Sequence, residues 1–397
     1  MLIFGGLLMI CVGIDISKYK HDCFILTDFG DVINEGFSFA NNAEGFGQFG
    51  RELERCKNGD EIRIGFEATG NYGINLKLFL ERIGYDYMEI NPLLVKKYIV
   101  SNTLRRTTTD KLSAKAIAVY ISEKPYRVHP SSFYQKFALK QLTRLRGSLV
   151  TGRSRYLIQL TNVLDCIFPE FKPFFGHRFS VTALYILAHY SSPEAIANMN
   201  SRSYDILRRK SRGKFSMDKF VKLKLLAKNT VGVFDDCYRV ELETLLELYS
   251  QIDAKICELE NEIREIIETL NPPTLSINGI GAISAAVIVS EFGDFSRFEN
   301  PGKMLSFAGL EPGYFQSGTM EHNGRMVKRG SSPLRSTLMN CSRSIRLHNE
   351  VFAAYYQKKV SEGKPYNVAV SHVAKKLVRL IFTLETKGER FDADKLR

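Results

Sequence analysis

The stretch CVGIDIS at residues 11–17 decides how the N-terminal part of this chain folds. Uninterrupted apolar residues lead up to Asp15, and charged residues are disfavoured inside strands. We therefore interpret residues 10–16 as a buried strand with a carboxylate at its exit. The stretch EIRIGF at residues 61–66 alternates like a strand and is followed at once by Glu67.

The segments around these two strands complete an α/β layer. They predict strands at 22–27, 32–39 and 85–90, helices at 43–55 and 74–83, and a further helix that starts at Asn91-Pro92. Three strands, a helix, and then a strand, a helix and a strand form the order that is typical of a mixed sheet covered by helices.

Two long helices are expected in the middle of the chain, at residues 131–168 and 241–270. The first ends near Phe168-Pro169, because proline cannot continue a helix. In the second, apolar residues recur alternately three and four positions apart, which is the heptad seam of a coiled coil. This predicts a coiled coil, either with the first helix or between chains, and the alternative is a long helix packed on its own domain. The seam consists of Leu242, Leu245, Tyr249, Ile252, Ile256, Leu259, Ile263, Ile266 and Leu270.

The charge of the chain favours a polyanionic partner. Its 397 residues include 55 Lys and Arg against 43 Asp and Glu, a formal charge of +12. Residues 96–155 hold fourteen cations against two acids, and residues 202–228 hold ten against two. A solvated helical face explains one such stretch, but two of them favour binding to a phosphate backbone. Candidate nucleic-acid-binding residues in the first stretch are Lys96, Lys97, Arg105, Arg106, Lys111, Lys140, Arg144 and Arg146.

The chain is expected in the cytoplasm and not in a membrane. Its first fourteen residues are apolar, but they lack the basic start and the small-residue cleavage site of a signal peptide. They are also too short for a membrane span of about 20 residues. The seven cysteines are scattered without a Cys-x-x-Cys pair, which indicates a reducing compartment and neither a disulfide framework nor a zinc ribbon.

Asp15 and Glu67 are candidate metal ligands. Two carboxylates at the exits of neighbouring strands repel each other unless a cation lies between them. Mg²⁺ is bound by carboxylates, water and phosphate oxygens, so two such acids suit a site that acts on nucleic acid. Two ordinary loop acids are the alternative, and a G-I-D-I-S strand also begins the fold of actin and the sugar kinases. Further on, Asp110 is expected at the start of a helix, and Ser113 lies one turn later, where a second carboxylate would be useful.

The C-terminal part contains a glycine turn, a serine beside glycine and a basic segment. The turn G-I-G before an apolar helix is typical of a helix-hairpin-helix, whose backbone N–H groups bind a DNA phosphate. A glycine-rich helix entry in an ordinary core is the alternative. Ser317, within the tripeptide Q-S-G, is either a nucleophile or part of a turn. Candidate DNA-binding residues in this part are Gly279, Gly281, Lys328, Arg329 and Arg335.

Nine short motifs occur in a fixed order along the chain. They are VGIDISK (12–18), FEATGNY (66–72), NP (91–92), TDKLSAKAIA (109–118), GIG (279–281), FAGLEP (307–312), QSG (316–318), KRG (328–330) and LR (334–335). Each motif alone is weak. The ordered set resembles the DEDD insertion-sequence transposases related to the Piv DNA invertase, which are called the one-ten family of insertion sequences.

The resemblance implies three domains. Residues 9–128 would form an α/β RuvC-like domain of RNase H fold that binds metal. Residues 129–270 would contain the basic long helices and the acidic coiled-coil helix. Residues 271–397 would form a mainly α C-terminal transposase domain with a helix-hairpin-helix-like motif and the catalytic serine.

The resemblance also implies the chemistry and the partners. Carried over by position, Asp15, Glu67 and Asp110 bind a divalent metal, Mg²⁺ or Mn²⁺, and Ser317 is the catalytic serine. Family members are thought to cut and rejoin DNA through a covalent phosphoserine in a synaptic tetramer, with the metal site supplied by a different subunit. Many of them are guided by a bridge RNA that pairs with donor and target DNA. The expected partners are therefore DNA, a bridge RNA and further copies of the chain, from a dimer to a tetramer.

This sequence departs from the family at Ser113, where the family has its fourth acid. Three carboxylates can still hold Mg²⁺ when phosphate oxygens complete its octahedron. Otherwise another acid such as Asp22 or Asp165 substitutes, or the protein is a non-catalytic nucleic-acid-binding relative. Two other functions stay open, a RuvC-like junction resolvase and an ATP-dependent kinase of the actin-like fold. The kinase would need glycine-rich phosphate loops, and only Gly279-Ile280-Gly281 comes near one.

Overall fold

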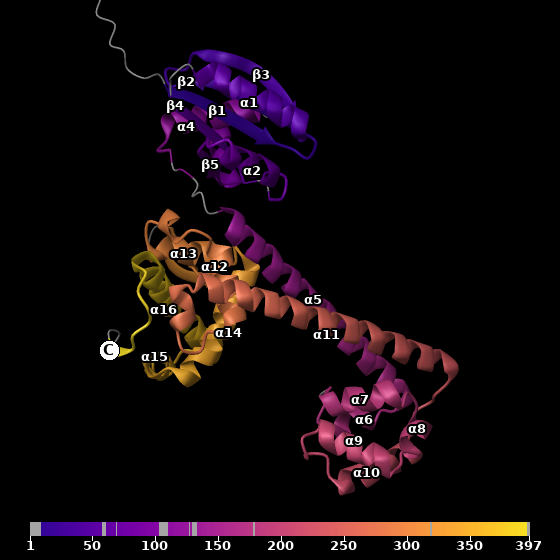
Figure 1. Ribbon diagram of the computed structural model, residues 1–397. Coiled ribbons are helices and arrows are strands. Elements are labelled where there is room, and N and C mark those ends of the chain that lie inside the picture. The colour runs from indigo at the N-terminus through magenta and orange to yellow at the C-terminus, as the bar shows by residue number, and fades with distance from the viewer. Residues whose placement is uncertain are drawn as a thin grey trace, which may run out of the picture. The chain divides into compact units, whose positions relative to one another are not determined.

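The computed structural model describes residues 9–394 apart from 58–60, 69, 103–109, 127, 129–132, 178 and 318–319. For residues 102, 110, 133–136, 312–317 and 320–325 it describes the backbone alone. The chain divides into two compact units, residues 1–135 and 136–397 (Figure 1). No helix among the described residues is long and apolar enough to cross a membrane.

The N-terminal unit is built on a mixed sheet of five strands in the order β3-β2-β1-β4-β5. Strand β1 pairs antiparallel with β2 and parallel with β4, and β4 pairs parallel with β5. The predicted α/β layer is thus confirmed, and each predicted strand is found within a few residues of its expected place. The strands are β1 (Met9–Ile16), β2 (Lys20–Thr27), β3 (Val32–Ala40), β4 (Glu61–Glu67) and β5 (Tyr87–Ile90).

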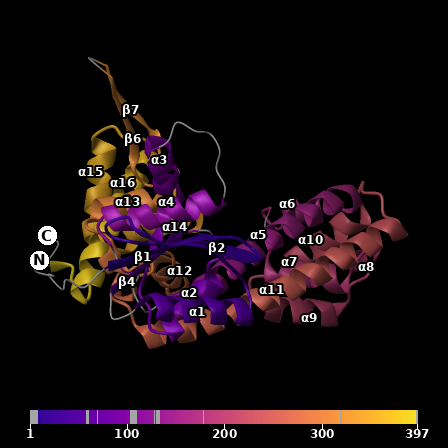
Figure 2. The same ribbon diagram turned by 90° about the horizontal axis from the view of Figure 1, so that it is seen from above.

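Helices cover both faces of this sheet (Figure 2). Helices α1 (Ala43–Lys57) and α2 (Ile74–Arg82) pack on the face that carries Val12 and Ile14. The opposite face, which carries Cys11, packs against α3 (Pro92–Asn102) and α4 (Asp110–Glu123).

Glycines allow α4 to lie directly on the central strands. A Cβ atom at Gly13 of β1 would overlap with main-chain atoms of Ala114 and Ala118. A Cβ atom at Gly65 of β4 would come within 2.7 Å of the Ile121 side chain. Gly13 and Gly65 therefore determine how closely α4 approaches the strands that carry Asp15 and Glu67.

The second unit begins with two long helices, α5 (Phe133–Ile167) and α11 (Asp236–Leu270), which lie side by side and antiparallel (Figure 1). Ion pairs join them, from Arg146 to Glu260 at 2.6 Å and from Arg153 to Asp253. The heptad seam predicted a coiled coil either with the first long helix or between chains. In the structure α11 packs along α5 of the same chain. A coiled coil between chains stays a prediction.

The predicted seam is wrong at its last position. Leu270 is 37% exposed, whereas the neighbouring Ile267 is fully buried. The reason is that the end of α11 packs into the C-terminal core, which also includes Leu139 of α5, so Ile267 and not Leu270 turns inward.

A small helical cap joins the far ends of α5 and α11, in a part of the chain for which no helices were predicted from the sequence. Its buried residues, such as Phe171 and Leu223, form one core with the last turns of α5 and the first turns of α11. The cap helices are α6 (Phe171–Phe174), α7 (Val181–His189), α8 (Pro193–Ala197), α9 (Ser201–Lys210) and α10 (Met217–Lys228).

A separate core holds the C-terminal part, which is mainly helical as expected. A two-stranded hairpin projects from these helices (Figure 2). The elements are the 3₁₀ turns η1 (Pro273–Ser276) and η2 (Phe295–Arg297), the helices α12 (Ala282–Phe292), α13 (Pro301–Ala308), α14 (Ser332–His348), α15 (Glu350–Ser361) and α16 (Tyr366–Lys387), and the strands β6 (Pro312–Ser317) and β7 (Met320–Met326).

Candidate active site

Strand register places Asp15 and Glu67 on the same face of the N-terminal sheet. Gly13 pairs with Gly65 in the parallel β1–β4 ladder, and both glycines face α4. Side chains alternate between the two faces of a strand, so the residues two positions further on face the same way. Asp15 and Glu67 thus lie side by side on the α4 face, both half-buried. Burial raises the pKa of the Glu67 carboxyl.

A third carboxylate, Asp22, lies directly opposite Asp15 in the antiparallel β1–β2 ladder. Asp22 is 3% exposed. Its carboxylate accepts a hydrogen bond from Ser38 and forms an ion pair with Lys20 Nζ at 3.0 Å. Burial opposes ionisation, but the hydrogen bonds from Ser38 and Lys20 and the charges of Lys20 and Lys111 outweigh it. They hold the pKa of Asp22 below its usual value. Sequence reasoning kept Asp22 only as a substitute, because strand register was needed to place it beside Asp15.

The start of α4 lies on the β2 side of this face, where the charge of Lys111 helps to lower the pKa of Asp22. The helix then crosses from β1 to β4, since Ala114 packs on Gly13 and Ile121 packs on Gly65. Asp110 is its first residue, as predicted, although the Asp110 side chain lies outside the described part of the chain. Ser113 is half-buried one turn later. Asp165, the other proposed substitute, is an exposed residue of α5 in the second unit.

Carboxylate oxygens are the ligands that a hard divalent cation prefers, and three adjacent strands carry one carboxylate each on this face. Within the described side chains, however, no three His, Cys, Asp or Glu residues are grouped closely enough to hold a metal ion. The Asp110 side chain is not among the described ones. A metal bound here would therefore need Asp110, or oxygen atoms of a substrate, in addition to Asp15 and Glu67.

Ser317 is the last residue of β6, the first strand of the projecting hairpin. The backbone of Ser317 pairs with that of Met320, and the Ser317 side chain lies outside the described residues. The base of the hairpin is well anchored. Val327 N donates to Glu311 O at 2.9 Å, and Ser331 N donates to Phe307 O at 3.2 Å.

Two glycines with positive φ make this anchoring possible. Gly309 has φ 67° and Gly330 has φ 103°. A Cβ atom at Gly309 would overlap with Arg329 O, and one at Gly330 would overlap with Phe307 O. The F-A-G and K-R-G motifs therefore meet at the base of the hairpin, and glycine is required on both sides of this contact.

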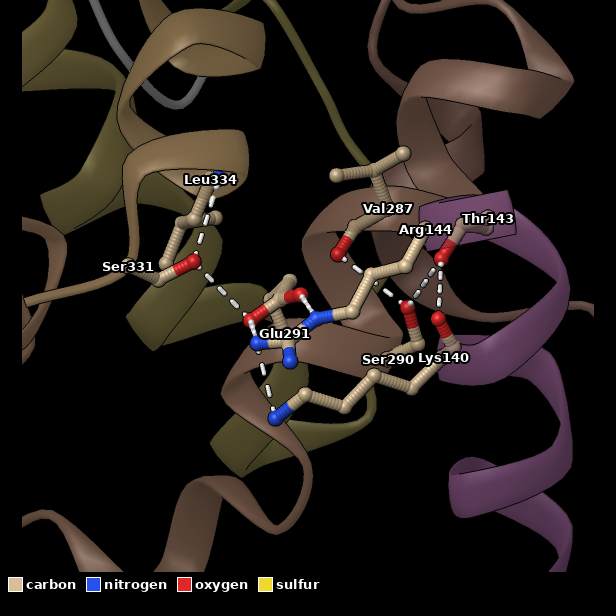
Figure 3. A network of polar contacts seen from close by, with 8 residues as sticks. All are labelled: Lys140, Thr143, Arg144, Val287, Ser290, Glu291, Ser331 and Leu334. Carbon is tan, nitrogen blue, oxygen red and sulfur yellow. Dashed lines mark hydrogen bonds and ion pairs between the residues drawn. The ribbon is translucent and has the colours of Figure 1, made fainter. Parts of the chain in front are cut away.

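A buried carboxylate, Glu291 of α12, connects the base of the hairpin to α5 (Figure 3). Arg144 donates to it twice, from Nε at 2.7 Å and from Nη2 at 3.1 Å, and Lys140 Nζ lies 3.5 Å away. Ser331 Oγ donates to Glu291 Oε2 at 2.9 Å and also accepts from Leu334 N, which caps α14. Burial opposes ionisation of Glu291, but the bonds from Arg144 and Ser331 and the charge of Lys140 lower its pKa.

The predicted nucleic-acid-binding cations fall into two groups. Lys140, Arg144 and Arg146 form ion pairs inside the second unit, which gives them a structural role that the sequence did not reveal. Arg335 is half-buried, and its Nη1 donates to Lys328 O at 3.2 Å. Arg105 and Arg106 lie outside the described residues. The side chains of Lys96, Lys97, Lys111, Lys328 and Arg329 are exposed.

The two glycines of the G-I-G turn differ in their surroundings. Gly279 has φ 101°, and a Cβ atom there would come within 3.0 Å of Ile345 Cα, so glycine is needed for packing. Gly281 is exposed, has open space around it and caps the N-terminus of α12. The element before this turn is the short η1 that follows α11, rather than a second helix of similar length.

Two family models match the chain and together cover more than half of it. One, described as a transposase and named for the DEDD transposases of IS110, matches residues 12–169. The other, described as "Transposase IS116/IS110/IS902 family", matches residues 274–357. The first match contains Asp15, Glu67 and Asp110, and the second contains Ser317.

Curated relatives are distant in sequence. An IS116 insertion-element protein of Streptomyces clavuligerus is 24% identical over 253 residues, 62% of this chain and 63% of the relative. An IS110 insertion-element protein of Streptomyces coelicolor is 25% identical over 137 residues, 34% of each chain. A probable family 20 transposase of Pseudomonas aeruginosa is 23% identical over 345 residues, 84% of this chain and 88% of the relative. The chain thus spans less than two thirds of the first two relatives.

Proposed function

Because this chain belongs to the IS116/IS110/IS902 family of transposases, we propose that it is a DNA transposase that cuts and rejoins DNA strands. The observation that carries the proposal is where the two family matches fall. One covers the sheet with its carboxylates, and the other covers the hairpin with Ser317. The carboxylates and Ser317 therefore both lie in segments that match transposase family models.

The N-terminal unit is proposed to be RuvC-like, with an RNase H fold. Its mixed sheet in the order β3-β2-β1-β4-β5, with α4 packed across the strands that carry the acids, supports this assignment. The domain boundaries at 128 and 270 stay predictions.

Asp15, Glu67 and Asp110 would hold the divalent cation, Mg²⁺ or Mn²⁺. A bound cation would stabilise negative charge on a DNA phosphate during cleavage. In this chain Asp22 adds negative charge beside Asp15, while Lys20 and Lys111 keep that carboxylate ionised. The half-buried Ser113 offers a hydroxyl that can hydrogen-bond water but supplies no charge.

Ser317 is proposed as the nucleophile. Its Oγ attacks the phosphorus of a DNA phosphodiester, a bond from Oγ to phosphorus forms, and the bond from phosphorus to one sugar oxygen breaks. The serine proton is lost to a base, and the leaving sugar oxygen gains a proton. Attack by the hydroxyl of another strand end on the phosphoserine reverses these changes and rejoins the DNA.

The remaining partners are proposed from family membership. The protein would bind donor and target DNA, would be guided by a bridge RNA, and would act as an oligomer, from a dimer to a tetramer. Exposed cations on α3, at the start of α4 and at residues 328–329 support contact with a phosphate backbone. Sequencing the RNA that co-purifies with the protein from its native locus tests the guide, and bulk cellular RNA alone would contradict it.

The second candidate function is a non-catalytic or weakened nucleic-acid-binding relative, which Ser113 favours. A RuvC-like junction resolvase that does not use the serine is the third. All three proteins would bind nucleic acid. Only the transposase with a serine nucleophile would form a covalent protein–DNA product.

The decisive experiment is an excision assay on a plasmid that carries the element with its own ends. The wild-type protein is expected to give excised product and a protein–DNA adduct that survives denaturation. Ser317→Ala should abolish both, whereas Ser336→Ala, an exposed serine of α14, should abolish neither. Normal excision by Ser317→Ala would exclude the phosphoserine mechanism.

A further inference from the structure

The segment R-R-K-S-R-G-K at residues 208–214, here called the basic turn, lies outside the proposed active site. It contains five cations and no acid, and it connects α9 to α10 in the helical cap. All five of its cationic side chains are exposed. An open pocket beside the turn is lined by Asp205, Arg208, Arg209 and Gly213.

The backbone of the basic turn is held in one conformation. Gly213 N donates to Arg208 O at 2.8 Å, and Phe215 N donates to Ser211 Oγ at 3.0 Å. Phe215 is 4% exposed in the cap core, so it anchors the end of the turn. Arg212 has φ 53°, a left-handed conformation that is unfavourable for arginine. Strained residues of this kind persist where the surrounding structure enforces them, and they cluster at functional sites.

The charges of the basic turn are not neutralised within the protein. In the part of the chain that the structure describes, no cation of residues 202–228 takes part in an ion pair. The cations of α5 contrast with them, since Lys140, Arg144 and Arg146 pair with buried or half-buried glutamates. Of the two basic stretches in the sequence, the second therefore keeps its charge available for a partner.

The surroundings of the turn indicate which kind of polyanion it fits. Binding of single-stranded nucleic acid uses exposed aromatic rings on which bases stack. The aromatic residues of the region 201–228 are Tyr204, Phe215 and Phe220, and all three pack into the cap core. The ring of Tyr185, 4.7 Å from Lys210 Nζ, is partly buried against the same core and already stacks on His189. Exposed cations whose neighbouring rings are already packed or stacked suit the phosphates of a double helix.

We propose that the basic turn is a DNA-binding site of the helical cap, which contacts backbone phosphates of double-stranded DNA independently of sequence. The choice of DNA rests on the proposed transposase function. The site itself rests on the exposed, unpaired cations and on the fixed turn that presents them. It would add a DNA contact at the end of the unit's long helices, distant in sequence from both Asp15 and Ser317.

The test compares two full-length variants that lose the same charge. The first is Arg208→Gln, Arg209→Gln and Arg212→Gln together. The matched control is Lys358→Gln, Lys364→Gln and Lys387→Gln together, which neutralises three exposed cations of α15, α16 and the segment between them. Binding of a labelled random-sequence DNA duplex is measured by fluorescence anisotropy at several salt concentrations. Circular dichroism melting checks that both variants are folded.

A plot of log Kobs against log salt concentration has a negative slope. We expect the magnitude of this slope to decrease by about 2 to 3 in the basic-turn variant, since each lost phosphate contact decreases it by about 0.9. Affinity near 0.1 M salt should fall by at least about tenfold, and the control should keep the wild-type slope. Arg208→Lys, Arg209→Lys and Arg212→Lys together should restore most of the slope. Equal losses in both variants, or no loss in either, would overturn the proposal.

Two further outcomes would also overturn it. A shallower salt dependence for a single-stranded RNA probe in the basic-turn variant, with the duplex DNA slope unchanged, would show that the turn binds a different nucleic acid. A loss of self-association in sedimentation, with the DNA slope unchanged, would show that the turn binds an acidic surface of a second copy. Ser317→Ala should bind duplex DNA like the wild type in this assay, so failure of the transposase chemistry and failure of this binding site are distinguishable.

Discussion

The two parts of the proposed active site are held in place by different means. Asp15, Asp22 and Glu67 lie on three adjacent strands, and the hydrogen-bond register of the sheet alone places them on one face. The hairpin with Ser317 projects from its unit, and its base is held by backbone hydrogen bonds and also by the side chains of Glu291, Arg144 and Ser331, which come from distant segments. Backbone register tolerates changes of side chain, whereas a network of buried charges does not. The two parts should therefore respond differently to substitution.

The largest effect is expected at the sheet, on chemistry and not on folding. Asp15→Asn removes a charge without changing the shape of the side chain, so recombination should fall more than about 10³-fold while stability changes little. Excision assays and thermal melting measure the two quantities. Asp31→Asn, in the exposed turn after β2, serves as the control and should keep activity. If Asp15→Asn unfolds the sheet instead, register is not what positions the acids.

The reverse pattern is expected at the hairpin base. Glu291→Gln removes the buried charge that Arg144 and Lys140 bind, while both cations keep partial access to solvent, so the free energy of unfolding should drop by about 1.5–3 kcal/mol. Glu258→Gln, which breaks the exposed pair with Lys255, should cost less than about 1 kcal/mol. Urea denaturation compares the two. Equal losses would show that the Glu291 network does not hold the hairpin base.

The same network predicts a pH dependence. The pKa of Glu291 is lowered in the folded state from its ordinary value of 4.5, so its contribution to stability is present above that pH. It is lost progressively as the pH falls below 4.5 towards the folded-state pKa. The stability difference between the wild type and Glu291→Gln should therefore shrink below that pH in urea titrations, and a constant difference would contradict the assignment.

A smaller effect is expected at position 113. Ser113→Asp restores a carboxylate one turn after Asp110, so Mn²⁺ should bind about tenfold more tightly by calorimetry, because each added ligand charge favours the cation. Recombination at limiting Mg²⁺ should rise in parallel. Ser122→Asp, near the other end of α4, is the control and should change neither quantity. Unchanged affinity in Ser113→Asp would place Ser113 away from the metal.

The smallest difference concerns the G-I-G turn. Gly279→Ala should destabilise the protein by about 1 kcal/mol or more, because φ is positive there and Ile345 is close. Gly281→Ala meets open space and should change stability by less than about 0.5 kcal/mol. Thermal melting of both variants measures this. Similar losses would mean that both glycines are needed for packing.

Much of the fold could be predicted from local patterns. The strands at Asp15 and Glu67, the start of α4 at Asp110 and both long helices were found where apolar periodicity and breaker residues put them. The heptad seam of α11 was predicted except at its end, where Ile267 replaces Leu270 in the core. The cap could not be predicted, since its short helices have mixed patterns and gain their core only by packing between α5 and α11.

The candidate site was predicted less completely. Asp22 was not selected, because its place opposite Asp15 depends on antiparallel register and not on spacing along the chain. Glu291 was not found either, since a single acid in an apolar helix gives no sign that Arg144 and Lys140 will pair with it. The roles of Asp15, Glu67, Asp110 and Ser317 stay predictions that the variants above test.

The sequence by itself determined the α/β layer, the long helices, the family and an excess of positive charge. It did so because periodicity, glycine and proline positions and short motifs are local properties of the chain. Only the tertiary structure decided which charges are available. It pairs Lys140, Arg144 and Arg146 with Glu291 and Glu260, and it leaves the basic turn at 208–214 exposed. The physical reason is that an ion pair depends on distance in space, and segments far apart in sequence set that distance.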